Sequence, residues 1–310
     1  MGSPVIEVVH LAKSYGSTRA VADVSLTVAE GEIFGILGPN GAGKTTTVEC
    51  LSGLRSPDSG SVRVLGIDPL RDPAAVRQVL GVQLQESRLP GKLRVLEALR
   101  LYAAFYPEPA DPEELLGLLG LTDRRDTSYR DLSGGQKQRL SIALALVGRP
   151  RVAILDELTT GLDPQARRET WGLIERVRDS GVTVLLVTHF MDEAERLCDR
   201  LVVIDRGQVV AQGSPAELTG DDGEQRTFRM RLPAGSLPGT GLLTALPEVT
   251  VAHEVDDLLE VTGTATVLPA VIIALHDRGI VPDEVRTVSR SLEDAFVALV
   301  ARNPQEETQR

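Results

Sequence analysis

Cysteine, aromatic residues and long apolar runs are scarce in this chain. Of its 310 residues two are cysteines, Cys50 and Cys198, and aromatic residues make up 3%. Two cysteines cannot build the disulfide framework of a small secreted domain, so a reducing cytosol and an ordinary apolar core are expected. No stretch reaches the roughly 18 apolar residues of a spanning helix, and residues 1–10 lack the pattern of a secretory signal. Any membrane role is therefore expected to depend on a partner.

Positive charge is also in short supply. The formal net charge is −11, and four of the 33 basic residues are lysines. An acidic chain is repelled by phosphate backbones, so nucleic acid is not an expected partner. The 42% of hydrophobic and 25% of charged residues are typical of a soluble globular protein.

Short β-branched runs alternate with helical patterns along most of the chain, which predicts an α/β fold with a parallel sheet covered by helices. The first two strands, at 5–9 and 21–28, are expected to be antiparallel. Further strands are predicted at 32–37, 61–66, 79–83, 151–155, 183–188 and 201–204. Helices are predicted at 44–54, 94–106, 113–121, 136–148, 165–180 and 191–198.

The order of these elements predicts two domains. The first covers residues 1–218, and a helical insert at about 86–150 interrupts its α/β core. A Gly-, Ser-, Pro- and Asp-rich linker is expected at 219–225. Residues 226–303 are long enough for a small α+β accessory domain, and 304–310 are polar and expected to fray.

A glycine-rich loop between a predicted strand and a predicted helix carries the first chemical signal. Residues 38–45 read GPNGAGKT, which satisfies G-x-x-x-x-G-K-[ST]. Glycines let the backbone curl so that its N–H groups face phosphate oxygens, and the helix start adds positive potential. Lys44 is expected to reach the β- and γ-phosphates, and Thr45 to offer its hydroxyl to Mg²⁺.

Two later strands end in polar residues at the same predicted sheet edge. The apolar run 152–155 ends in Asp156 and Glu157, which suits Mg²⁺ binding by the first and activation of water by the second. Acids also end strands without any function. His189 follows the strand 183–188, where it could touch the γ-phosphate, although an isolated histidine is more often structural.

The run Leu132-Ser133-Gly134-Gly135-Gln136 opens another predicted helix. It is either a second anion site or a simple N-cap followed by a glycine turn. A second phosphate-binding helix start makes sense if it serves the nucleotide held by another copy of the chain.

The ordered set of these motifs resembles the ATP-binding subunit of ABC transporters over about residues 4–218. It comprises Tyr15, the loop 38–45, Gln85, LSGGQKQR at 132–139, ILDE at 154–157, Gly161-Leu162-Asp163 and His189. The resemblance implies a P-loop NTPase core with an antiparallel β subdomain and a helical insert. Three residues depart from the family pattern: Leu84 and Leu158 stand where proline is usual, and Val82 where an aromatic residue is usual.

The resemblance also implies roles for individual residues, with ATP and Mg²⁺ as cofactors. Catalytic roles fall to Glu157, His189, Lys44 and Gln85, and metal contacts to Thr45, Gln85 and Asp156. Gln85, not Gln83, matches the family's Q-loop glutamine, and Tyr15 the aromatic that stacks on adenine. The implied nucleotide contacts are Tyr15, Gly38, Pro39, Asn40, Gly41, Ala42, Gly43, Lys44, Thr45, Thr46, Ser133, Gly134, Gly135, Gln136 and Asp163.

By the same resemblance, two copies pair head to tail and sandwich each ATP, and a separate transmembrane permease is the second partner. The chain would then be cytoplasmic and peripheral on the inner face of the membrane. The segment 291–296, SLEDAF, resembles the end of exporter ATPases that work with ABC-2-type permeases, in the daunorubicin/doxorubicin-resistance branch. Export of a drug-like or other hydrophobic substrate is thus the leading prediction. The alternatives are an importer ATPase and a soluble ABC ATPase without transport.

Overall fold

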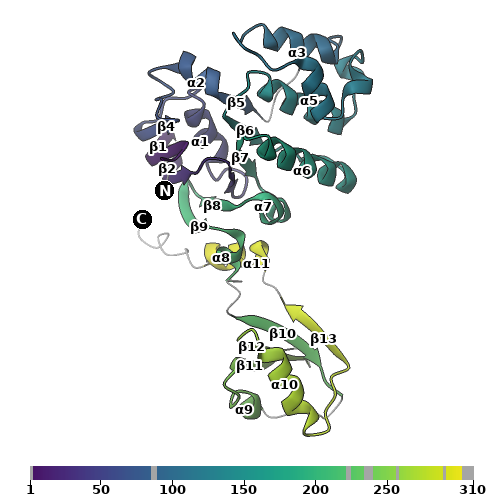
Figure 1. Cartoon of the computed structure of the whole chain (residues 1–310). Coiled ribbons are helices and arrows are strands. Elements are labelled where there is room, and N and C mark those ends of the chain that lie inside the picture. Colours follow the sequence, from purple (N-terminus) through teal and green to yellow (C-terminus); the bar gives the residue numbers. More distant parts are fainter. Residues whose placement is uncertain are drawn as a thin grey trace. The chain divides into compact units, whose positions relative to one another are not determined.

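The computed structural model describes residues 3–84, 89–220, 225–233, 240–255, 258–288 and 291–301. The chain divides into two compact units, Met1–Pro215 and Ala216–Arg310 (Figure 1). This division lies three residues before the boundary expected at 218. The short helix α8 (Pro215–Thr219) precedes the stretch expected to be a linker and overlaps it at Thr219 only.

The N-terminal unit is built on one nine-stranded sheet in the order β4-β1-β2-β9-β8-β3-β7-β6-β5. Strands β8, β3, β7, β6 and β5 run parallel, whereas β1 pairs antiparallel with both β2 and β4. The strands are β1 (Ile6–Tyr15), β2 (Thr18–Val28), β3 (Ile33–Leu37), β4 (Ser59–Val64), β5 (Leu80–Gln83), β6 (Val152–Asp156), β7 (Thr183–Thr188), β8 (Arg200–Asp205) and β9 (Gln208–Gly213).

Strand β9 was not expected from the sequence. Its residues are half-buried or exposed without a clear alternation, so hydropathy gives no strand signal there. It pairs antiparallel with β8 and makes one parallel bridge to β2, from Gln208 to Asp23. That bridge joins the antiparallel strands and the parallel strands into one sheet.

The central strands position the functional loops. Every residue of β3, β6 and β7 is buried, as expected for parallel strands covered on both faces. Leu37 pairs with Thr188, and Asp156 pairs with Val187. The residues that follow these three strands therefore emerge together at the carboxyl edge of the sheet, where ligands bind in open α/β sheets.

Seven α-helices accompany this sheet in the described ranges. They are α1 (Lys44–Leu51), α2 (Pro73–Val79), α3 (Val95–Ala103), α4 (Pro112–Leu118), α5 (Gly134–Leu146), α6 (Pro164–Asp179) and α7 (Met191–Leu197). Helix α2 was also unexpected; it starts at Pro73, and the Asp72 carboxylate accepts the Ala75 N–H at 3.0 Å. Helices α3, α4 and α5 contact one another and form the helical insert (Figure 1).

The C-terminal unit has a core of its own. Strands β10 (Arg226–Arg231), β11 (Val249–Val255), β12 (Leu258–Gly263) and β13 (Glu284–Val288) form an antiparallel sheet in the order β11-β12-β10-β13. The remaining helices are α9 (Thr240–Leu243), α10 (Val267–His276) and α11 (Leu292–Ala301). Phe228, Met230 and Val261 of the sheet belong to the same buried apolar cluster as Val271 and Leu275 of α10.

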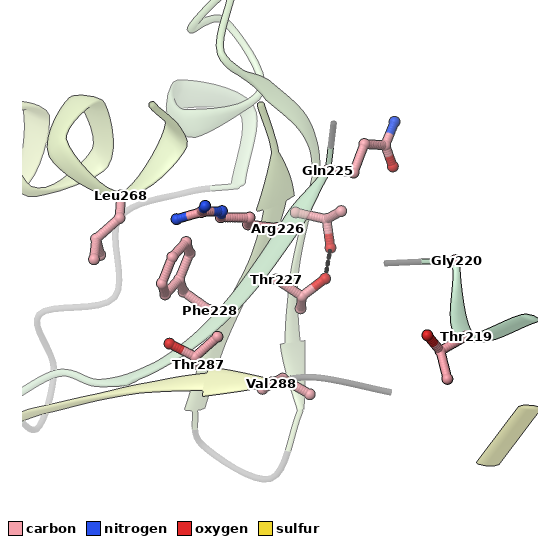
Figure 2. Close-up of a pocket in the computed structure, with 10 residues that line it drawn as sticks. Thr219, Gly220, Gln225, Arg226, Thr227, Phe228, Leu268, Thr287 and Val288 are labelled. Carbon is pink, nitrogen blue, oxygen red and sulfur yellow. Dashed lines mark hydrogen bonds between the residues drawn. The ribbon is translucent and has the colours of Figure 1, made fainter. Parts of the chain in front are cut away.

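A cavity of about 490 Å³ opens beside β10 in this unit (Figure 2). Its lining mixes hydroxyl groups with apolar side chains such as Phe228 and Leu268, and the Thr227 and Thr262 hydroxyls share a hydrogen bond of 2.8 Å. Within the described ranges, no helix of either unit has both the length and the apolar composition for crossing a lipid bilayer.

Candidate nucleotide site

The glycine-rich loop links β3 to α1 and has a shape that side chains would prevent. Gly43 adopts a φ of 103°, and a Cβ atom there would lie 2.4 Å from the Ala20 carbonyl oxygen. At Gly38 a Cβ atom would lie 2.1 Å from the Ile204 carbonyl oxygen. Glycine is thus required at both positions by close backbone approach, and at 43 by the left-handed conformation as well. The loop is held tightly against its neighbours.

The Lys44 ammonium lies inside this curl. Its Nζ donates to the carbonyl oxygens of Gly38 (2.8 Å) and Pro39 (3.1 Å), and the residue is 5% exposed. Burial lowers the Lys44 pKa, and the negative charges of the nearby Glu157 and Asp156 carboxylates oppose this shift. Thr45 is exposed in the first turn of α1, and Thr46 is half-buried. The loop therefore presents a cation and a hydroxyl next to its backbone N–H groups.

Asp156 ends β6 as a buried and unpaired carboxylate. It is 1% exposed, and in the described part of the chain neither of its carboxylate oxygens has a hydrogen-bond partner. Burial, and then the Glu157 charge, raise its pKa to about 6 against the opposing effect of Lys44. A buried carboxylate without donors needs a cation or ordered water to offset its lost hydration. This environment suits Mg²⁺ or its water shell.

Glu157 and His189 meet beside Lys44. The Glu157 Oε1 atom lies 3.2 Å from His189 Nδ1 and 3.9 Å from Lys44 Nζ. The His189 ring packs against Phe190, with centroids 4.1 Å apart. Glu157 adopts the left-handed conformation, with φ 49°, and its N–H donates to the Val187 carbonyl at 2.9 Å. The structure thus brings a carboxylate, an imidazole and an ammonium together from the residues that follow β6 and β7 and from the start of α1.

Tyr15 lies at the end of β1 and is 41% exposed. Cations flank its ring: Lys13 Nζ lies 5.9 Å and Arg55 Cζ 5.2 Å from the centroid. Such pairs orient an aromatic ring without burying it. The hairpin of β1 and β2 borders the glycine-rich loop through Ala20, whose carbonyl closely approaches Gly43.

The segment 133–136 forms the N-terminus of α5, and its side chains cap that helix. The Ser133 hydroxyl accepts the Gln136 N–H (3.3 Å), and the Gln136 side chain accepts the Ser133 N–H (3.0 Å). This reciprocal pair is a capping box. The first-turn N–H groups of Gly134 and Gly135 have no intrahelical acceptor and can bind an anion.

This segment and Asp163 line one cavity of about 400 Å³. Among the described residues that line it, none belongs to 38–46. The Asp163 carboxylate caps α6 by accepting the N–H groups of Gln165 (2.9 Å) and Ala166 (3.0 Å), which lowers its pKa. Asp163, which was expected at the nucleotide, lines the same cavity as Ser133 in this chain.

Gln85 lies outside the described residues. Two other glutamines, neither of which was among the expected site residues, contact the acidic strand end. Gln83 bonds to the Asp156 backbone, and Gln138 bonds to the carbonyl of Leu158. The available signal was position: Gln83 ends an otherwise apolar strand, and Gln138 lies one helical turn after Gly134.

Together, the strand–loop–helix phosphate loop, the acidic end of β6 and the sheet order define the class of P-loop nucleoside triphosphatases. The ABC transporter family model matches residues 21–160. Two solved structures share the fold: an ATP-binding cassette of an ABC transporter in its ADP conformation (TM-score 0.63, 25% identity, covering 70% of this chain and 93% of that one), and cbiO1 of Clostridium perfringens (TM-score 0.64, 28% identity, covering 71% and 92%).

Curated relatives align over both units. The daunorubicin resistance ATP-binding protein DrrA3 of Streptomyces coeruleorubidus is 37% identical over 307 residues, or 96% of each chain. A Nod factor export ATP-binding protein I of Cupriavidus metallidurans is 39% identical over 307 residues, which cover 96% of this chain and 98% of the relative. The chain therefore belongs to the ATP-binding proteins of the ABC transporter family and is an ABC ATPase.

Proposed function

We propose that this protein is the ATP-hydrolysing subunit of an exporter and drives transport through a separate ABC-2-type membrane permease. The observation that carries the ATPase part is the meeting of Lys44, Glu157 and His189 at the glycine-rich loop. The export part is supported by relatives named for daunorubicin resistance and for Nod factor export, which align over nearly the whole chain.

ATP would lie with its phosphates on the backbone N–H groups of the loop 38–46. Lys44 would exchange its present acceptors, the Gly38 and Pro39 carbonyls, for phosphate oxygens. Tyr15 would stack on the adenine through its exposed ring. Such contacts fix the geometry of phosphoryl transfer, which depends mainly on positioning and electrostatic stabilisation.

Glu157 would accept a proton from the attacking water. His189 lies 3.2 Å from its Oε1 atom and would hold the carboxylate and contact the γ-phosphate. Thr45, Asp156 and, by the family pattern, Gln85 would hold Mg²⁺, which neutralises phosphate charge when bound. The unpaired buried oxygens of Asp156 fit that ion.

A second copy would complete the site. The N–H groups of Gly134 and Gly135 and the Ser133 hydroxyl would cover the γ-phosphate held by the partner subunit, with Gln136 and Asp163 nearby. This arrangement explains why the segment 133–136 forms a cavity that lacks the phosphate loop of its own chain. The permease would hold the dimer on the inner face of the membrane.

The test is ATP turnover by the purified chain across a range of protein concentrations, with Ser133→Arg as the disrupting variant. We expect turnover per subunit to rise with concentration, and mixtures of Ser133→Arg with Lys44→Ala chains to regain activity, because each mixed dimer holds one intact composite site. Full activity of a strict monomer, or of Ser133→Arg alone, would exclude the two-chain site.

Export is tested separately with a candidate ABC-2-type permease that co-purifies with this chain. Inside-out vesicles that contain both should accumulate daunorubicin in an ATP-dependent manner, and vesicles with Glu157→Gln should not. Uptake that requires a solute-binding protein would identify an importer instead.

A further inference from the structure

We infer that Gln83 and Gln138 are positioning residues that hold the backbone of the Asp156–Glu157 pair from both sides. The inference rests on the proposed ATPase function and extends it, because neither glutamine is in the set of residues expected to touch nucleotide. Each comes from a different element: Gln83 ends β5, and Gln138 belongs to α5.

Gln83 extends the pairing of β5 with β6 by one step. The ladder between these strands ends at the pair Gln83–Leu155. Beyond it, the Gln83 Oε1 atom accepts the Asp156 N–H at 3.0 Å, so the side chain replaces a backbone acceptor. Its Nε2 atom donates to the Leu84 carbonyl at 2.8 Å. Both ends of the amide are thus bonded, and the residue is 3% exposed.

Gln138 acts on the other side of the pair. Its Nε2 atom donates to the Leu158 carbonyl at 2.7 Å, and Leu158 is fully buried. Gln138 lies on α5, the helix that Ser133 caps. The bond therefore ties the residue after Glu157 to the helix that would cover the partner's nucleotide.

The backbone between these two bonds is strained. Glu157 has a φ of 49°, a conformation that L-residues with a Cβ atom rarely adopt. Such a conformation persists when the surroundings over-determine it. Three hydrogen bonds do so here: Asp156 N–H to Gln83, Glu157 N–H to Val187, and Gln138 to Leu158.

The consequence is a fixed direction for both carboxylates. The left-handed turn at Glu157 separates the two side chains, so that Glu157 reaches His189 while Asp156 stays buried. Loss of either glutamine bond would release this turn without removing any group that touches ATP. Catalysis would then suffer more than binding, because a small misplacement of a catalytic group costs rate.

The experiment compares Gln83→Met and Gln138→Met, which keep the side-chain length and remove the hydrogen bonds. Gln78→Met is the matched control, since Gln78 is exposed on α2. ATP affinity is measured by isothermal titration in EDTA, kcat and KM with Mg²⁺, and folding by thermal melting. We expect kcat to fall about tenfold for Gln83→Met and about threefold or more for Gln138→Met, as the loss of one hydrogen bond predicts. We expect ATP affinity in EDTA to stay within about twofold, which is at most about 0.4 kcal/mol.

Two results would overturn the inference: an unchanged kcat in both variants, or equal losses in kcat and in ATP affinity in EDTA. If Gln83→Met does not fold, Gln138→Met decides alone, because its bond is only partly buried. An unsubstituted chain that binds ATP but never hydrolyses it would overturn the proposed function, and the inference with it. That outcome is distinct, because the control and the unsubstituted chain would then be equally inactive.

Discussion

The replacement Glu157→Gln tests the site most directly. It preserves the shape of the side chain and removes one of the two carboxylate charges near Lys44, those of Asp156 and Glu157. In the structure that charge faces Lys44 Nζ at 3.9 Å and His189 Nδ1 at 3.2 Å, and it helps to raise the pKa of Asp156. The expected result is an enzyme that binds ATP and does not turn it over.

The magnitudes follow from these contacts. A general base contributes about 10²–10⁴ in rate, or about 2.7–5.4 kcal/mol, so turnover should fall by at least a hundredfold. Two unit charges about 4 Å apart attract by about 4 kcal/mol near a protein surface. When Lys44 moves to the phosphates, it loses part of its attraction to Glu157. Removal of the Glu157 charge should therefore leave ATP affinity equal or higher. The Asp156 pKa should fall below about 6, which keeps that carboxylate ionised for Mg²⁺.

The assay combines ATP titration with single-turnover hydrolysis and size-exclusion chromatography in ATP and Mg²⁺. We expect a stable ATP-bound dimer of the variant, because ATP that is not hydrolysed stays bound between the two copies and keeps the dimer closed. His189→Ala is the companion variant, since it leaves the base in place and removes its 3.2 Å contact. Hydrolysis by Glu157→Gln at the rate of the unsubstituted chain would refute the assignment of the base.

Three further outcomes are expected. Lys44→Met should lower ATP affinity at least tenfold by titration, because a buried ammonium that balances two carboxylates is lost; unchanged affinity would contradict its role at phosphate. Gly43→Ala should lower the free energy of unfolding in urea more than Gly41→Ala, since both have positive φ but only Gly43 would bring a Cβ atom within 2.4 Å of the Ala20 oxygen. Burial raises the Glu193 pKa, so the folded state favours the protonated acid and loses stability as pH rises from the unfolded pKa through the folded one. Glu193→Gln should remove that loss, and its stability relative to the unsubstituted chain should increase between pH 4 and pH 8; a constant difference would show that Glu193 does not titrate in the fold.

Much of the fold could be predicted from the sequence because its signals are local. The short apolar run that became β3, the glycines after it and the helix at Lys44 follow from composition and backbone freedom alone. The meeting of Glu157 with His189 could also be expected, since parallel strands deliver their carboxyl ends to one edge.

Other features depend on contacts that no local pattern encodes. Asp163 matches a family position for nucleotide, but in one chain its carboxylate caps α6 and lies beside Ser133. Gln83 was set aside in favour of Gln85, because alignment identifies a position and cannot show a bond to the Asp156 N–H. β9 has little apolar periodicity, and it is a strand because its backbone pairs antiparallel with β8.

Strand β5 is the outermost strand at one end of the N-terminal sheet. It has four residues and, among the described strands, pairs with β6 alone, whereas β3, which leads into the phosphate loop, lies between β7 and β8. A force applied to the chain at Leu84 is thus resisted by the short β5–β6 pairing and by the hydrogen bond from the Gln83 amide to the Leu84 carbonyl. The acidic turn that Gln83 bonds to therefore lies one strand from the sheet edge, whereas the phosphate loop follows a strand flanked on both sides.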